Sequence, residues 1–391
     1  MFTVPGQLIN HPDLYSLQLY PENSDRPAPM MRLNSSEQMV LRFDMIETRT
    51  RQFRISLTHH NPDWSRSVLP PEVYSDGFAE TFFGGGRPSR SQRPSYRQYE
   101  FSFPNSRLSI NKSGNYMLRV EDYETGNLMF SLPFFVYEDE GEITSSINTI
   151  MAPRRNLRIH HLPRSRYAYP GFVEMPQFDL DVYFNQNQFW GRMQKADGFD
   201  ATSPGVVFSE VTRNRSFVGD QEFRVLDIPE LSLQTPDILN YQPGYEPPRL
   251  IKDVDVQGLT RGFVDTPASR FGQPRSDLDA RYGDVYFTFQ PKEPISVGQE
   301  IYLVGDFNNW SIQSDLKLRY DEERDTWKVN AWIKEGTYAY KYVLKENGNI
   351  FDMALDDTFA RSRQEYITFV YYRDPVRHHY RLLQTNTFYS N

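Results

Sequence analysis

The chain has 391 residues, a formal net charge of −8 and no cysteine. Disulfides and thiol catalysis are therefore excluded, the negative charge argues against a general nucleic-acid binder, and no apolar run reaches the roughly 18 residues that a membrane-spanning helix needs. The length predicts two to three domains, and an aromatic content of 15% with 27 prolines and 22 glycines favours strands joined by turns.

Residues 1–139 are predicted to form a first β-sandwich. Apolar residues alternate with polar ones, which predicts half-buried strands, around residues 17–19, 39–43, 53–57, 99–103, 116–120 and 132–136. Between the third and fourth of these, Pro71 to Ser75 is predicted to hold one helical turn, and residues 78–88 (FAETFFGGGRP) to form a long loop. An acidic connector follows at residues 138–142.

The remaining chain is predicted to form two more sandwiches. Residues 140–280 are predicted as a middle sandwich with strands at 176–184, 205–212 and 222–227, and with long loops over the Pro-, Gly- and Asp-rich residues 242–276. Residues 281–391 are predicted as a third sandwich that runs from a strand at 284–289 to one at 366–372. The fold class is thus all-β: tandem immunoglobulin-like or early-set β-sandwiches with few short helices.

One stretch of the third unit carries a distinctive motif. An apolar strand runs into Gly305-Asp306-Phe307-Asn308-Asn309-Trp310, and after Gly336 the tyrosines at 338, 340 and 342 alternate along another strand. This string resembles the early-set immunoglobulin-like domains of the glycogen- and starch-binding kind. The resemblance implies that Trp310 stacks on a sugar ring and that Lys341 binds its hydroxyls. The second stacking ring and the asparagine of such sites have no counterpart here, so the alternative that Trp310 only packs its turn stays open.

Other chemistries find no support in the sequence. The pairs His59-His60, His160-His161 and His378-His379 are adjacent residues, which face opposite ways on a strand and so rarely chelate one ion together. The acidic run at 321–325 lacks EF-hand spacing, the run Gly84 to Gly86 lacks the Lys-Ser/Thr of a phosphate-binding loop, and neither G-x-S-x-G nor H-E-x-x-H occurs. We therefore predict no catalytic residues, no metal ligands and no cofactor, hence a protein that is not an enzyme.

A series of strings along the chain points to one family. In order, they include LTHHNPDW at 57–64, EVYSDGF at 72–78, YEFSFPN at 99–105, SGNYMLRV at 113–120, NQNQFW at 185–190, EFRVLDI at 222–228 and VYYR at 370–373. Together they resemble the plug proteins of the Bacteroidota type IX secretion system. The resemblance implies a periplasmic, multi-sandwich protein, monomeric when free, that reversibly occludes a very large outer-membrane β-barrel translocon. Family members carry a cleaved leader, and residues 1–5 (MFTVP) lack the basic and apolar regions of one, so we expect the leader to be absent from this sequence.

Two segments have the composition expected of a surface that binds a polar, wet barrel, in which aromatic residues and arginines dominate. The first, residues 82–99, contributes Phe82, Phe83, Arg87, Arg90, Arg93 and Tyr96. The second, residues 154–172, contributes Arg154, Arg155, Arg164, Arg166, Tyr167 and Tyr169. The alternative is that both are flexible, solvated loops. A carbohydrate-binding protein that uses Trp310 and Lys341 is the second functional hypothesis.

Overall fold

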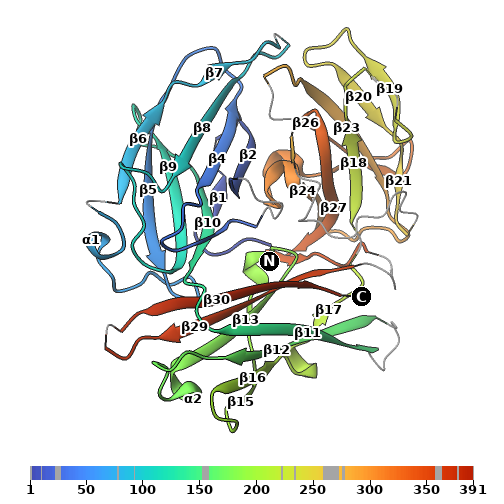
Figure 1. Cartoon of the computed structure of the whole chain (residues 1–391). Helices are drawn as coiled ribbons and strands as arrows, with labels where there is room; N and C mark the ends of the chain where they lie inside the picture. Colours follow the sequence, from blue (N-terminus) through green and yellow to red (C-terminus); the bar gives the residue numbers. More distant parts are fainter. Residues whose placement is uncertain are drawn as a thin grey trace.

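The computed structural model describes residues 2–9, 11–22, 28–76, 79–91, 93–151, 158–221, 223–232, 235–258, 273–274, 278–356, 363–376 and 378–390. Six sheets in these ranges form three β-sandwiches, and the short α-helices are α1 (Pro71–Tyr74) and α2 (Pro176–Asp179). The all-β prediction is confirmed, and α1 coincides with the predicted helical turn. Figure 1 shows two sandwiches side by side above a third that lies across their lower ends.

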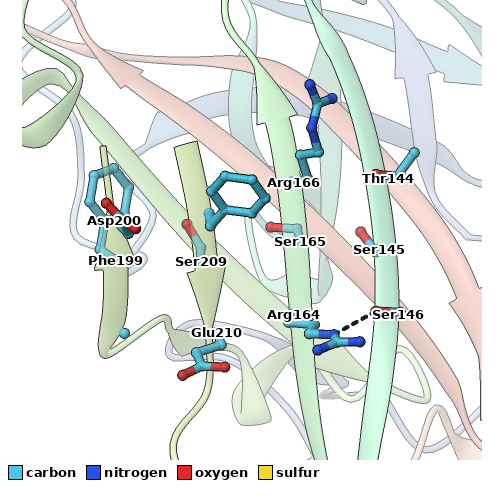
Figure 2. A pocket seen from close by; sticks show the side chains of 12 residues that line it. Thr144, Ser145, Ser146, Arg164, Ser165, Arg166, Phe199, Asp200, Ser209 and Glu210 are labelled. Carbon is cyan, nitrogen blue, oxygen red and sulfur yellow. Dashed lines mark hydrogen bonds between the residues drawn. The ribbon is translucent and has the colours of Figure 1, made fainter. Parts of the chain in front are cut away.

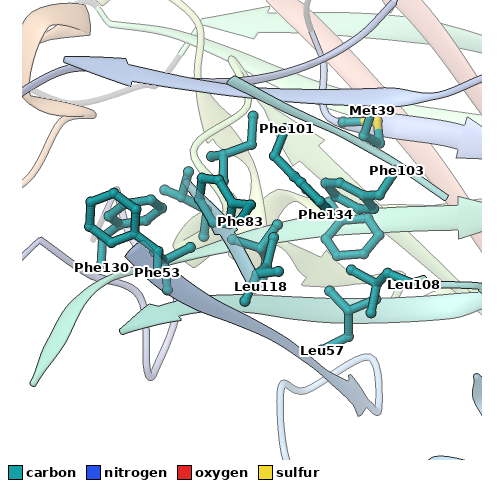
Figure 3. Close-up of a cluster of buried hydrophobic side chains, with 14 of the residues drawn as sticks. Met39, Phe53, Leu57, Phe83, Phe101, Phe103, Leu108, Leu118, Phe130 and Phe134 are labelled. Carbon is teal, nitrogen blue, oxygen red and sulfur yellow. The ribbon is translucent and has the colours of Figure 1, made fainter. Parts of the chain in front are cut away.

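The first sandwich is built from residues near the N-terminus. One sheet contains β1 (Leu8–Ile9), β3 (Met30–Arg32), β5 (Gln52–His60), β6 (Glu80–Gly84), β9 (Gly114–Asp122) and β10 (Leu128–Tyr137), in the order β1-β10-β9-β5-β6 with β3 paired to β10. The facing sheet contains β2 (Leu14–Pro21), β4 (Met39–Met45), β7 (Arg87–Pro88) and β8 (Arg97–Phe103), in the order β2-β4-β8-β7. Figure 3 shows the phenylalanine-rich core between them.

The predicted long loop at 78–88 is wrong for its described part. β6 pairs with β5, and β7 pairs with β8. Gly85 has a φ of +76°, which permits the tight turn between β6 and β7, and a Cβ on Gly86 would lie 2.5 Å from the ring of Tyr99. The glycines that suggested a loop therefore serve a turn and a close packing contact between strands.

The middle sandwich joins two parts of the chain that lie far apart in sequence. Its outer sheet contains β11 (Glu142–Met151), β12 (Ile159–Ala168), β15 (Gly198–Asp200), β16 (Val206–Glu210) and β17 (Phe217–Val218), in the order β11-β12-β16-β15 with β17 paired to β12. Its inner sheet contains β13 (Leu180–Gln186), β14 (Gln194–Lys195), β29 (Glu365–Arg373) and β30 (Tyr380–Tyr389), in the order β14-β13-β29-β30. The 3₁₀ turns η1 (Trp190–Arg192) and η2 (Arg213–Arg215) belong to the same unit.

The third sandwich lies between these two parts in sequence. One sheet contains β18 (Arg224–Ile228), β22 (Gln273–Pro274), β24 (Gln299–Gly305), β27 (Gly336–Glu346) and β28 (Asn349–Phe351), with β18, β22, β24 and β28 all paired to β27. The other contains β19 (Ile238–Gln242), β20 (Arg249–Lys252), β21 (Asp255–Val256), β23 (Tyr282–Gln290), β25 (Arg319–Asp321) and β26 (Thr326–Lys334), in the order β19-β20-β23-β26-β25 with β21 paired to β23. The turns η3 (Asp306–Asn308) and η4 (Ser314–Leu316) follow β24.

The strand pairings do not follow the predicted boundary between residues 280 and 281. β29 pairs with β13 from Leu180 to Gln186, so the C-terminal hairpin completes the middle sandwich rather than the third. Conversely, β20 and β21, which lie in the predicted loops of 242–276, pair in parallel with β23. Neither set of strand pairings was predicted, because the alternation of apolar residues marks the buried face of a strand but does not identify its partner strand. The division of the chain into three domains itself stays a prediction.

The sandwiches meet through aromatic clusters. The rings of Phe135 in β10 and Phe369 in β29 lie 4.8 Å apart, and Trp190 lies 4.8 Å from Phe135, which joins the first and middle sandwiches. A second cluster, with Phe2, Phe189 and Phe223, joins the middle and third sandwiches. These contacts cover the upper side of the middle sandwich in Figure 1 and leave its outer sheet facing away from the other two.

Candidate functional site

The outer sheet of the middle sandwich carries a groove of about 540 Å³, which we call the outer groove. It lies over β11, β12, β16 and β15, and Figure 2 shows the side chains that line it. Three cross-strand rows supply them. Residues 144, 166, 208 and 200 form one row and residues 146, 164, 210 and 198 form a second, and these two share one face of the sheet because strand residues two apart project to the same side. Residues 145, 165, 209 and 199 form the row between them.

Charge is unevenly distributed across the outer groove. Its two cations, Arg164 and Arg166, come from β12, whereas its carboxylates, Glu210 and Asp200, come from β16 and β15. The Nε of Arg164 donates to Ser146 Oγ at 2.9 Å, so this side chain leans toward β11 and away from its cross-strand neighbour Glu210. The groove is therefore basic on the side of β11 and acidic on the side of β15.

The charged side chains of the groove differ in whether they have hydrogen-bond or ion-pair partners within the protein. The Asp200 carboxylate accepts hydrogen bonds from the Thr202 backbone N–H at 2.9 Å and its hydroxyl at 2.7 Å, and these bonds lower the pKa of Asp200. In the part of the chain that the structure describes, Arg166 makes no ion pair or side-chain hydrogen bond, and it is exposed. This guanidinium is thus available to an anionic group of a partner.

Apolar rings complete the outer groove. Phe208 is 44% exposed in β16, and Phe199 is 37% exposed in β15. More exposed apolar side chains occur nearby in sequence, at and before α2: Phe172, Met175 and Phe178. A surface that combines exposed rings with arginines resembles the centre of protein–protein interfaces more than an ordinary solvated surface.

The predicted segment 154–172 is only partly a surface of this kind. Arg164 and Arg166 do line the groove. Tyr167, however, is fully buried and donates from its hydroxyl to the Glu140 carbonyl at 2.7 Å, because it alternates with the arginines along β12 and so faces the core. Tyr169 is half-buried and accepts from the Gly205 N–H at 3.0 Å. Arg154 and Arg155 lie outside the described residues.

The alternative that 154–172 is a flexible loop is wrong for most of its described residues. Ten of its residues form β12, which pairs with β11 along its whole length. In this strand Ser165 stands between Arg164 and Arg166, and polar residues on both faces obscure the apolar alternation that marks a half-buried strand.

The predicted segment 82–99 does not form one surface. Phe82 is exposed and packs edge-on against Tyr123 at 5.2 Å, whereas Phe83 lies in the core of the first sandwich. Tyr96 is buried, and its hydroxyl donates to the Ala280 carbonyl at 2.9 Å. Hence the phenylalanines separate to opposite faces of β6.

The arginines of this segment also separate. Arg87 is exposed and donates to Gln98 Oε1 at 3.0 Å, Arg90 pairs with Asp279 at 2.7 Å, and Arg93 is exposed. Since Arg90 and Tyr96 contact residues 279–280, this part of the segment binds the chain's own third sandwich. We therefore place the stronger candidate for partner binding at the outer groove.

Trp310 and Lys341, the residues of the sugar-binding motif in the third sandwich, both contact other parts of the same protein. Trp310 lies among Phe2 at 5.7 Å, Phe189 at 5.0 Å and Phe223 at 5.6 Å, measured between ring centroids. Its indole N–H donates to Asp306 Oδ1 at 3.0 Å. Lys341 is 2% exposed, and its ammonium group pairs with Asp356 at 2.7 Å. Trp310 thus joins the third sandwich to the middle one and to the N-terminal segment, whereas Lys341 is paired within the third sandwich.

Trp310→Ala is expected to lower the free energy of unfolding by about 2 kcal/mol, because it removes a partly buried ring that three phenylalanines contact. Urea denaturation followed by circular dichroism measures the change. Phe351→Ala in the same sandwich is the matched control, because Phe351 is exposed and its loss should cost less than about 0.5 kcal/mol. Equal stabilities of the two variants would contradict a packing role for Trp310.

The described ranges offer neither a candidate metal site nor a candidate membrane-spanning helix. These ranges contain no group of three or more His, Asp or Glu side chains that could hold a metal ion. They also contain no helix long and apolar enough to cross a membrane.

Comparison with known proteins identifies two modules. Residues 14–138 match the family model of the type 9 secretion system plug protein 1st domain, and residues 284–359 match that of the starch binding domain. Both resemblances inferred from the motifs are thereby confirmed, and both families consist of non-catalytic modules. The chain is accordingly related to type 9 secretion or to carbohydrate binding. No curated protein matches it.

One solved structure has the same fold over the whole chain. A hypothetical protein from Parabacteroides merdae ATCC 43184 superposes with a TM-score of 0.87 at 22% identity, over 99% of this chain and 100% of that one. The BSP domain of a biofilm associated protein aligns with a TM-score of only 0.19 at 10% identity, over 100% of this chain and 61% of that one. The C-terminal domain of the antigen I/II-family protein AspA from Streptococcus pyogenes gives 0.17 at 9% identity, over 96% and 99%.

Proposed function

We propose that this protein is a non-enzymatic, periplasmic plug that reversibly occludes the large outer-membrane β-barrel translocon of type 9 secretion, and that it is a monomer when free. The observation that carries the proposal is the match of residues 14–138 to the first domain of plug proteins. The translocon is the partner that the name of this family suggests.

The outer groove is the docking surface that we assign to this function. It combines Arg164 and Arg166 with the exposed rings of Phe199 and Phe208, and it lies on the side of the molecule that faces away from the other two sandwiches. A plug has to leave the barrel as well as bind it, so a modest interface with a polar rim suits the role better than an extensive apolar one.

A pull-down from envelope extracts tests the proposal. The tagged protein serves as bait, and mass spectrometry identifies what it retains from an organism that has the type 9 system. We expect one very large outer-membrane barrel, and we expect the double variant Arg164→Glu/Arg166→Glu to lose it. Arg213→Glu/Arg215→Glu is the matched control, since these arginines are exposed in η2 of the same sandwich. If the barrel is never recovered, the proposal fails.

A carbohydrate-binding function is the second candidate, and the match of residues 284–359 to the starch binding domain favours it. The packing of Trp310 and the ion pair of Lys341 oppose it, because a sugar would have to displace Phe2, Phe189 or Phe223 from the indole. Retention of the protein on an amylose column, lost in Trp310→Ala, would establish this candidate in place of the plug.

A further inference from the structure

β11 is an edge strand whose outer side is unpaired. It pairs with β12 from Glu142 to Met151 without a register shift. Just before it, the N–H groups of Glu138 and Glu140 donate to the Leu382 and Leu383 carbonyls of β30, at 3.0 and 2.9 Å. Beyond Gly141, no described strand forms a ladder with β11 on that side. In the described residues, the backbone donors and acceptors on that side of β11 therefore have no ladder partner, although β30 of the facing sheet lies beside the strand.

β11 lacks the sequence features that usually protect such an edge. Its sequence, EITSSINTIM, contains neither proline nor lysine, its ladder to β12 contains no bulge, and Glu142 is its only charged residue. Natural proteins commonly cover, twist or charge long edge strands because these strands pair readily with other chains. An unprotected edge of 10 residues beside the outer groove therefore fits a role in pairing with a partner.

The chemistry next to the edge indicates what the partner strand carries. Thr144 and Ser146 lie on the groove face of β11, and directly behind them on β12 stand Arg166 and Arg164. A guest strand would lie one strand spacing, about 4.8 Å, beyond β11. Acidic side chains opposite positions 144 and 146 could then reach the two guanidinium groups across the short Thr and Ser side chains. Arg164 already leans this way, toward Ser146.

Other occupants fit this edge less well. The carboxylates of the groove, Glu210 and Asp200, lie on the far strands, so they neither neutralise the arginines nor repel an acidic guest at β11. A second copy of this chain could pair its β11 with β11 of the first. Arg164 and Arg166 of the two copies would then repel one another, because Glu142 is the only acidic residue that β11 contributes.

We propose that the edge of β11 accepts an extended segment of a partner protein as an added strand, and that this segment carries acidic residues at positions i and i+2. Those positions share one face of a strand, as Arg166 and Arg164 do. The inference rests on the proposed docking function, for which it specifies the kind of segment that the partner presents. Backbone hydrogen bonds to β11 hold the segment, and the two arginines fix its register.

Synthetic peptides test the inference on the full chain. The probe is a fluorescent peptide of alternating Thr and Val with Glu at i and i+2, and binding is followed by anisotropy. We expect the unaltered protein to bind it, Arg164→Glu/Arg166→Glu to lose about tenfold or more in affinity, and Arg213→Glu/Arg215→Glu to bind as the unaltered protein does. A peptide with Glu at i and i+1, which places the charges on opposite faces, should bind weakly.

Hydrogen exchange provides a second measurement, because electrostatic attraction alone would leave the exchange rates of the β11 amides unchanged. Strand addition should slow the exchange of amides within residues 142–151 when the peptide is bound. Binding without protection of β11, equal affinity for the i/i+1 peptide, no binding up to millimolar concentration, or a protein dimer that buries β11 would each overturn the inference. If the peptide fails but the pull-down still depends on Arg164 and Arg166, the docking function stands and only the strand addition is wrong.

Discussion

Replacing Lys334 with methionine is expected to lower the free energy of unfolding by about 3–5 kcal/mol, the cost of removing one partner from a buried ion pair. The ammonium group of Lys334 in β26 lies 2.8 Å from Asp44 Oδ2 in β4, and both side chains are 1% exposed. The pair therefore joins the third sandwich to the first, and the variant leaves a carboxyl group in a site that water does not reach.

The surroundings of this pair show why the loss should be large. The Tyr282 hydroxyl donates to the same Asp44 oxygen at 2.8 Å and accepts from Ser16 at 2.6 Å. The Lys334 ammonium group also lies 4.4 Å from the centre of the Tyr96 ring. Each of these groups comes from the first or the third sandwich, so loss of the cation should loosen the junction between them.

The loss of unfolding free energy in Lys334→Met should depend on pH. Burial raises the pKa of Asp44, and the attraction of Lys334 opposes that rise. Without Lys334, the folded state should favour the protonated carboxyl still more strongly. An acid whose pKa is higher in the folded than in the unfolded state destabilises the fold as pH rises above its unfolded value, so Lys334→Met should be more damaging at pH 8 than at pH 5.

Urea denaturation at the two pH values measures this effect, with two companion variants. Lys317→Met is the matched control, because Lys317 pairs with Glu300 at the surface and its loss should cost less than about 1 kcal/mol. Asp44→Asn combined with Lys334→Met should recover most of the stability at pH 8, since no buried charge then remains. A loss below about 1 kcal/mol for Lys334→Met alone would show that the pair does not hold the two sandwiches together.

Acid is expected to destabilise the protein through two buried histidines. His59 is 1% exposed and His161 is 4% exposed. Burial lowers the pKa of His59 to about 4, although its ring Nε2 donates to the Ser113 carbonyl at 3.0 Å, and burial lowers the pKa of His161 to about 4 as well. The neighbouring imidazoles, His379 and His60 beside His59 and His160 beside His161, oppose protonation further.

The direction of the effect follows from these shifts. The unfolded chain takes up protons below about pH 6.5, whereas the folded chain resists them until about pH 4, so protonation favours unfolding in that window. Each histidine should contribute a loss of about 3 kcal/mol by pH 4, and none above about pH 7. His59 lies close to β30 of the middle sandwich through His379, 6.4 Å away, so its protonation should also weaken the junction of the first two sandwiches.

Variants isolate this contribution from other titrating groups. Burial raises the pKa of Asp306 to about 7, which makes the fold more stable as pH falls and so opposes the histidines. The informative quantity is therefore the difference in unfolding free energy between His59→Gln or His161→Gln and the unaltered protein, from pH 7 to pH 4. The variants should gain relative stability toward pH 4. His378→Gln, an exposed site, is the control, and parallel profiles for all proteins would contradict the prediction.

The sequence alone predicted the fold class, most of the strands and both family resemblances. Alternation was clear where one face of a strand packs against an apolar core, as in the residues that became β4, β5 and β27. It failed in β12, where Arg164 and Arg166 face solvent and Ser165 faces inward, and in β7, where glycine and proline mark a turn beside a short strand. Local pattern is informative only when burial is the main constraint on a strand.

The tertiary structure alone decided which strands pair and which side chains are free. β29 joins β13 across a long stretch of chain, and no local signal specifies that partner. In β16 the apolar residue faces solvent and the polar one faces the core, since Phe208 is exposed while Ser209 is buried. From the sequence alone, Phe208 would therefore be assigned to the core rather than to the outer groove. Trp310 and Lys341 match a sugar-binding pattern, yet three phenylalanines pack against Trp310 and Asp356 forms an ion pair with Lys341. A motif specifies the groups present at a position, but their availability depends on what the rest of the chain packs against them.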